Sequence, residues 1–223
     1  MEENCYQSED KEDELLEREW NAINNEFLKF KERGEKLEEH RTHHKQFIKD
    51  LDHLFLDQTN NYDVTLTSGE KVFYCHKGIL SARSPVFKAM FQSNMKENEL
   101  GTVEIEDIQQ EVVSELLQYI YSGTMSLNFE KYGKELLAAA EKYQVDQLKR
   151  ACENELISKL DAENCIEMLL LGDRYKAMNL KKSAFEFFKK NEEKFDTYDW
   201  DLVYEDNPKL VFDVMKCLLK SKI

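Results

Sequence analysis

The stretch that decides the fold is residues 62–91, YDVTLTSGEKVFYCHKGILSARSPVFKAMF. Two β-rich runs of alternating side chains, 62–66 and 71–75, flank a glycine-containing turn. This arrangement predicts a β-hairpin, and the residues that follow it predict a short helix. Ser84 and Pro85 then supply an N-cap and a proline at the first helical position, so a second helix is expected to begin there.

The rest of the chain predicts one more strand, at 102–106, and then helices alone. The 223 residues include only seven glycines and two prolines, and so few helix breakers favour long helices. Apolar residues at helical spacing predict helices around residues 113–120, 136–143, 148–156, 166–173, 180–188 and after Pro208. The sequence therefore predicts an α+β fold, a small sheet flanked by helices, followed by an all-α region that begins near residue 158.

The N-terminal part of the chain has a different pattern. Residues 1–14 are polar and acidic and are predicted to be disordered. From Leu16, steps of four and three residues give Leu16, Trp20, Ile23, Phe27, Phe30, Gly34, Leu37, Arg41, His44, Ile48, Leu51 and Phe55. Nine of these twelve positions are apolar, which predicts one helix, or two helices broken near Gly34, with a long apolar seam. The seam is expected either to pair with a second copy or to fold back on its own domain.

Charge and composition argue against several classes of partner. The net charge of −14 is opposite to that of a surface that neutralises nucleic-acid phosphates or anionic lipids. No apolar run approaches the roughly 20 residues that a membrane-spanning helix needs. The five cysteines are scattered without a CxxC pair, so they are expected to be reduced thiols rather than zinc ligands or disulfides. We therefore expect a protein of the nucleus or cytoplasm.

The chain lacks the common motifs of enzyme chemistry. It contains neither a glycine-rich phosphate loop, nor a GxSxG elbow, nor an HExxH motif. His40, His43 and His44 lie at helical spacing among charged residues, which favours a solvated helix surface over a metal site. His76 is expected to be a hydrogen-bonded core residue rather than a base. The sequence therefore predicts a non-catalytic protein with no metal and no cofactor.

Several runs between residues 63 and 143 together resemble a BTB/POZ domain. They are Asp63-Val-Thr-Leu66, Phe73-x-x-His76-Lys77, Arg83-Ser84-Pro85-x-Phe87, Val103-Glu-Ile105, Tyr119-Ile-Tyr-Ser-Gly123 and Leu136-Leu-Ala-Ala-Ala-Glu-Lys-Tyr143. Within that family the chain is most similar to speckle-type POZ proteins, whose BACK-like helices the later residues resemble. Such proteins usually carry an N-terminal MATH domain, for which the first 46 residues are too short and too helical. The expected organisation is a tail at 1–14, a coiled-coil-like helix at 15–46, the POZ domain at 47–157 and BACK-like helices at 158–223.

The resemblance also implies three interaction surfaces. POZ domains of this type dimerise through their first helix, which corresponds here to Phe47, Ile48, Leu51, Leu54 and Phe55. Relatives that bind the cullin of BTB adaptors carry a hydrophobic-x-Glu motif, matched by Met95-Lys-Glu97, with Phe91 and Tyr121 as supporting surface. A second oligomer interface in the last helix corresponds to Leu210, Val211, Val214 and Met215, although packing within the domain is the simpler interpretation.

These surfaces imply a non-catalytic adaptor. It is expected to form a homodimer and to link an unknown substrate protein to a cullin-RING ubiquitin ligase, for ubiquitination and proteasomal degradation. The helix at 15–46 is the candidate surface for the substrate. One alternative is a POZ dimerisation scaffold or transcriptional co-regulator without a ligase role. Another is a MATH-less partner that modulates its full-length relatives.

Overall fold

The computed structural model describes residues 3–56, 61–92, 101–125, 129–195, 204, 207–212 and 214, with side chains from residue 25 onward, Glu192 excepted. The chain divides into two compact units, Met1–Asp50 and Leu51–Ile223. The first unit consists of most of one helix, and the second contains the sheet and the remaining helices.

Helix α1 runs without interruption from Glu3 to Leu56. The structure thus has a helix where a disordered tail was predicted for residues 3–14, and it has no break at Gly34. No proline lies in this stretch, and Gly34 is its only glycine. Good helix formers, chiefly Glu, Lys and Leu, surround that single weak position and carry the helix through it.

The sheet has three strands in the order β2-β1-β3. Strands β1 (Val64–Ser68) and β2 (Lys71–Cys75) form the predicted antiparallel hairpin, in which Leu66 is opposite Phe73. Gly69 in the turn has a φ of 58°, a left-handed conformation that glycine adopts without strain. Strand β3 (Thr102–Glu104) runs parallel to β1 on its other side. The hairpin and the third strand are therefore both confirmed.

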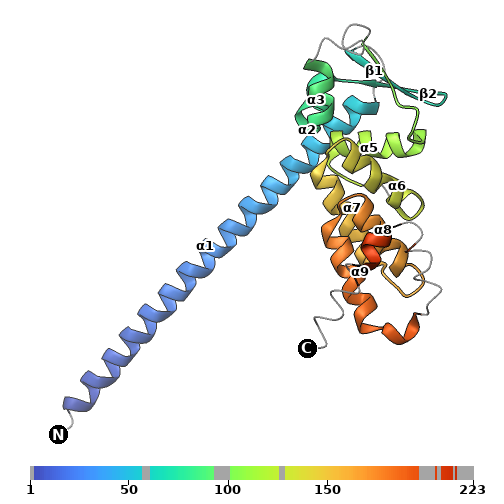
Figure 1. Cartoon of the computed structure of the whole chain (residues 1–223). Helices are drawn as coiled ribbons and strands as arrows, with labels where there is room; N and C mark the ends of the chain where they lie inside the picture. The colour runs from blue at the N-terminus through green and yellow to red at the C-terminus, as the bar shows by residue number, and fades with distance from the viewer. Residues whose placement is uncertain are drawn as a thin grey trace. The chain divides into compact units, whose positions relative to one another are not determined.

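The helices of the second unit follow the predicted order (Figure 1). They are α2 (Lys77–Arg83), α3 (Pro85–Gln92), α5 (Gln110–Ser122), α6 (Phe129–Lys142), α7 (Asp146–Ser158), α8 (Cys165–Arg174) and α9 (Met178–Lys190), followed by a 3-10 turn (Glu192–Lys194). The predicted cap of α3 is confirmed, because the backbone N–H of Phe87 donates to Ser84 Oγ at 3.1 Å. The Ser84 hydroxyl in turn donates to the Tyr143 carbonyl at 2.6 Å, so the cap also ties α3 to the end of α6.

One hydrophobic core extends from the sheet to the C-terminal helices of the second unit. Its fully buried side chains come from both halves of the unit and include Leu66, Phe87, Leu117, Leu137, Leu169 and Leu180. Burying a side chain of this size contributes about 1.5–3 kcal/mol. The core continues past residue 158, where the sequence predicted a domain division, so residues on both sides of that position share one folded unit.

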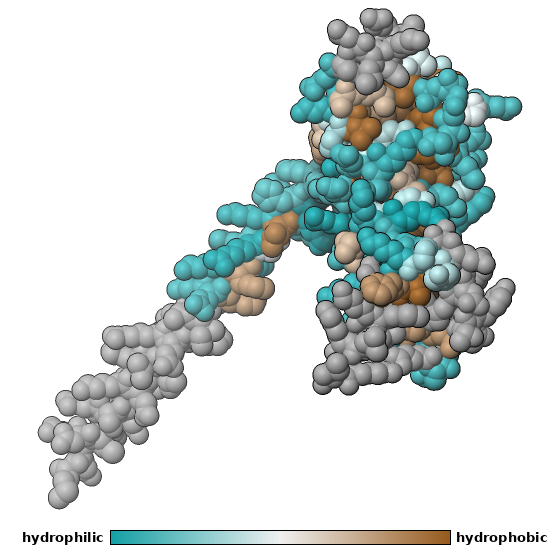
Figure 2. Space-filling model, in the orientation of Figure 1, coloured by the Kyte–Doolittle hydropathy of each residue, from teal (hydrophilic) through white to brown (hydrophobic). Residues whose placement is uncertain are grey.

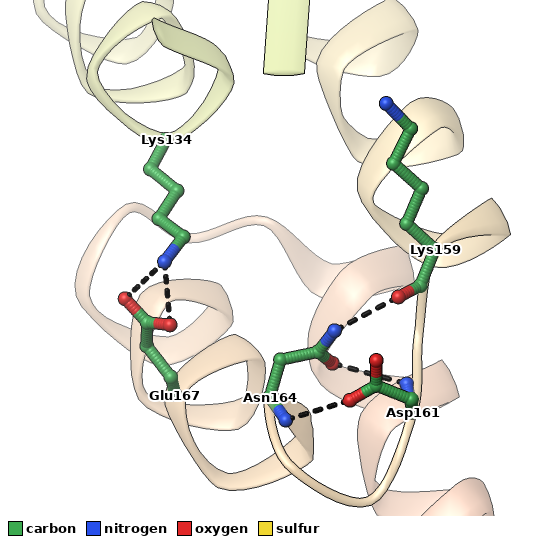
Figure 3. A network of polar contacts seen from close by, with 5 residues as sticks. All are labelled: Lys134, Lys159, Asp161, Asn164 and Glu167. Carbon is green, nitrogen blue, oxygen red and sulfur yellow. Dashed lines mark hydrogen bonds and ion pairs between the residues drawn. The ribbon is translucent and has the colours of Figure 1, made fainter. Parts of the chain in front are cut away.

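Polar contacts fix the turn between α7 and α8, next to the predicted division (Figure 3). Asp161 and Asn164 exchange backbone-to-side-chain hydrogen bonds at 3.1 and 2.9 Å, and the Asn164 amide donates to the Lys159 carbonyl at 2.8 Å. Lys134 of α6 pairs with Glu167 of α8 at 2.6 Å. The later helices are therefore held against the earlier ones through short contacts. A BACK-like identity for residues 158–223 stays a prediction.

Candidate functional site

The last turns of α1 carry the five residues that the sequence predicts for dimerisation. Phe47 is 58% exposed, while Ile48, Leu51, Leu54 and Phe55 are half-buried. Leu54 and Phe55 pack against the hydrophobic core of the second unit. Phe47, Leu51 and Leu54 are four and three residues apart, which places them along one helix face. The end of α1 thus combines an attachment to the core with apolar surface that remains open to a partner.

Phe55 is anchored by an aromatic and polar cluster on α5 and the end of β2. Its ring lies 4.9 Å from the ring of Tyr121. The Tyr121 hydroxyl accepts the backbone N–H of His76 at 2.9 Å and is hydrogen-bonded to His76 Nδ1 at 2.8 Å. His76 is therefore the hydrogen-bonded residue that was predicted. Burial raises the pKa of Tyr121, so its hydroxyl keeps its proton and remains a hydrogen-bond donor.

Cys75, beside this cluster, is an inert thiol. Burial raises its pKa to about 12, against a smaller opposing effect of a hydrogen bond with Tyr121. Cys152 and Cys165 are also buried, with pKa values raised by burial to about 12 and about 11. All three are free thiols, as predicted. Reactive cysteines need a depressed pKa and exposure, so none of the three has the character of a nucleophile.

The predicted cullin-binding residues fall into two groups. Met95 and Glu97 lie outside the described residues. Phe91 and Tyr121 are buried, at 9% and 3% exposure. The Phe91 ring stacks on Phe87 with centroids 6.0 Å apart. These two side chains offer little surface because both belong to the core, so their predicted contact with a cullin has no support from their placement.

The described residues of the predicted C-terminal interface are buried in the second unit. Leu210, Val211 and Val214 are buried, and Met215 lies outside the described residues. The segment is tied to α8, because the Asn207 amide donates to Asp173 at 2.6 Å while its oxygen accepts the N–H of Leu210 at 3.0 Å. Their burial agrees with packing within the domain. A second oligomer interface stays a prediction.

Sequence reasoning missed an apolar groove of about 420 Å³ in the second unit. Its apolar lining comes from α8, α9 and the last described residues, namely Leu169, Met178, Phe185, Leu210 and Val214. Met178 is 65% exposed at the start of α9. The groove forms where α9 lies beside Leu210 and Val214, which are distant from it in the sequence. No local sequence pattern predicts such a groove.

The described residues contain no group of three or more His, Cys, Asp or Glu side chains placed to hold a metal ion. No helix in the described part of the chain combines the length and the apolar character that crossing a bilayer requires.

The second unit is thus a small mixed sheet packed among helices, with Leu51 and Leu54 at the end of α1 only half-buried. Residues 52–160 match the family model of the BTB/POZ domain, so the chain carries a BTB/POZ domain over these residues. This is a domain of protein–protein interaction and dimerisation, and it is not catalytic. A closer likeness to speckle-type POZ proteins stays a prediction.

Among solved structures, the chain is similar to the BTB domain of zebrafish PATZ1. The two are 24% identical, with a TM-score of 0.45, and the match covers 54% of this chain and 95% of that one.

Replacing Tyr121 with Phe is expected to lower the free energy of unfolding by about 1–3 kcal/mol, because it leaves the His76 N–H and ring nitrogen without their partner. Urea denaturation of the full chain measures the effect. Tyr119→Phe is the matched control, since the structure describes no hydrogen bond to that hydroxyl and little change is expected. Equal stability of the two variants would contradict a stabilising role of the hydrogen bonds between the Tyr121 hydroxyl and His76.

Proposed function

We propose that this protein is a dimeric adaptor that links a target protein to a cullin-RING ubiquitin ligase in the nucleus or cytoplasm. The observation that carries the proposal is the BTB/POZ domain at residues 52–160. The chain contributes proximity and orientation, and the ligase partners contribute the chemistry. Two copies in one complex raise the local concentration of targets and ligase arms.

The apolar surface at the end of α1 supports self-association. Phe47 is largely exposed and Leu51 half-exposed, four residues apart on one helix. Burial of each large apolar side chain contributes about 1.5–3 kcal/mol. In a two-fold dimer every such contact occurs twice, because both copies present the same surface.

The sequence between α3 and β3 supports the cullin partner. Met95-Lys-Glu97 begins three residues after α3 ends at Gln92. Methionine can fill an irregular apolar notch, and a glutamate can accept a charge-assisted hydrogen bond. The motif is short, and its position directly after α3 gives it weight.

The test is a titration of the purified chain against the N-terminal region of the BTB-class cullin. We expect saturable binding that falls at least tenfold in the double variant Met95→Ala plus Glu97→Ala. The matched control is Asn98→Ala plus Glu99→Ala in the same segment, which should bind like the parent chain. Absence of binding by the parent dimer would overturn the ligase role and favour a POZ scaffold or co-regulator.

A further inference from the structure

We propose that α1 pairs with α1 of a second copy of this chain as a parallel, in-register, two-stranded coiled coil. This surface extends well beyond the dimer face at residues 47–55. It rests on the dimer of the proposed function but not on the cullin partner.

The middle of the apolar seam of α1, from Phe27 to Leu37, is exposed in the single chain. Phe27, Phe30 and Leu37 are 63%, 74% and 65% exposed. Their spacing continues the rhythm of four and three residues through Ile48 and Leu51. A heptad repeat of this kind keeps one face of each helix turned toward a partner helix. In the space-filling view, hydrophobic residues interrupt the largely hydrophilic surface of the coloured part of α1 (Figure 2).

Continuity with the BTB/POZ domain selects a second copy and a parallel direction. The 54 residues of α1 end within that domain, at Leu56. At about 1.5 Å per residue, the helix is about 80 Å long. An antiparallel pair along the seam would carry the two domains to opposite ends of the coil. Two domains that dimerise with each other require the C-terminal ends of both α1 helices to meet, which only a parallel pair provides.

Charged residues beside the middle of the seam, between positions 26 and 38, match this register. With Phe27 and Leu37 at the a and d positions, Glu26 and Arg33 occupy g while Lys31 and Glu38 occupy e. In a parallel coiled coil, each g residue faces the e residue five positions later on the partner helix. Glu26 therefore faces Lys31 of the second copy, and Arg33 faces Glu38 of the second copy.

The stability of a single helix does not explain these complementary charges. Residues five apart do not face each other on one helix, whereas those three or four apart do. Glu38 also has a contact of the latter kind, 3.6 Å from Arg41, with both side chains well exposed. Such an exposed pair is weak and can be shared with a partner helix.

Three seam positions, Gly34, Arg41 and His44, are not apolar. Polar residues inside a coiled-coil seam lower its stability and fix its register. The outward residues of the same turns, among them Glu32 and Glu39, stay free of the seam and remain available to a target protein. The coil would thus leave a strongly charged outer surface in place.

Cysteine cross-linking of the full chain tests the pairing. The variants Phe30→Cys and Leu37→Cys are made in a Cys5→Ser plus Cys217→Ser background, which leaves the three buried thiols. Disulfides form only when Cα atoms come within about 7 Å, as d positions do in a parallel, in-register pair. Under mild oxidation with diamide, both variants should cross-link at least tenfold more than the outward control Glu32→Cys.

A charge exchange tests the register in the same assay. Glu26→Lys in the Phe30→Cys chain is expected to lower cross-linking severalfold, and adding Lys31→Glu should restore it. Sedimentation equilibrium separates the possible failures. A dimer in which seam and control positions cross-link equally overturns the coiled coil but keeps the proposed POZ dimer. A monomer overturns both.

Discussion

Substituting Gly172 with Ala is expected to lower the free energy of unfolding by about 2 kcal/mol, because an overpacking cost of about 3 kcal/mol exceeds the gain in helix propensity. A Cβ atom at this position would lie 2.6 Å from the backbone nitrogen of Lys181 and 2.7 Å from its Cα. Those atoms belong to α9, so the steric clash is relieved only if α8 and α9 move apart. The better helix propensity of Ala, about 1 kcal/mol, offsets only part of the cost.

Gly133→Ala is the matched control for this prediction. Its Cβ would also meet another atom at 2.6 Å, but that atom belongs to the side chain of Phe129. A ring can rotate away, whereas a packed backbone cannot, so this variant is expected to stay within about 1 kcal/mol of the parent, the scale of the helix propensity gain. Urea denaturation gives both values. Equal stability of the two variants would contradict the close approach of α8 and α9.

Glu153→Ala is expected to lower the free energy of unfolding by about 3 kcal/mol, because unsatisfied buried donors cost about 1–3 kcal/mol each. Glu153, in α7, is only 4% exposed. Its Oε2 accepts the backbone N–H groups of Asn179 and Leu180 at 2.8 and 3.1 Å. These lie in the first turn of α9, where the N-cap residue, Ala177, has no polar side chain. Glu153 therefore caps α9 from another helix.

Two companion variants test this assignment. Glu153→Gln keeps one oxygen acceptor and loses the charge that favours a helix N-terminus, so an intermediate loss of about 1–2 kcal/mol is expected. Glu155→Ala alters an exposed residue on the same helix and should change little. A loss below about 1 kcal/mol in Glu153→Ala would contradict the capping role, since one unsatisfied donor alone costs that much.

Local signals in the sequence predicted most of the secondary structure. The hairpin around Gly69 and the N-cap at Ser84 each depend on residues within a few positions of one another. The family resemblance rests on the same residues, which is why the BTB/POZ domain could be recognised.

Features that depend on distant residues were not predicted. The partners of Glu153 lie 26 and 27 positions further along the chain. The burial of Tyr121 depends in part on packing with Phe55, which belongs to another element. The core likewise continues across residue 158 through the packing of α7 against α9, which no local pattern contains.

The most direct test of the account is the mass of the complex between the full chain and the N-terminal region of the BTB-class cullin, measured by light scattering after size exclusion. The chain alone should elute at 53 kDa, twice its 26.5 kDa. The mixture should form a complex of two chains and two cullin fragments. A dimeric chain that elutes apart from the cullin would contradict the adaptor function, and a monomeric chain would contradict the dimer on which it depends.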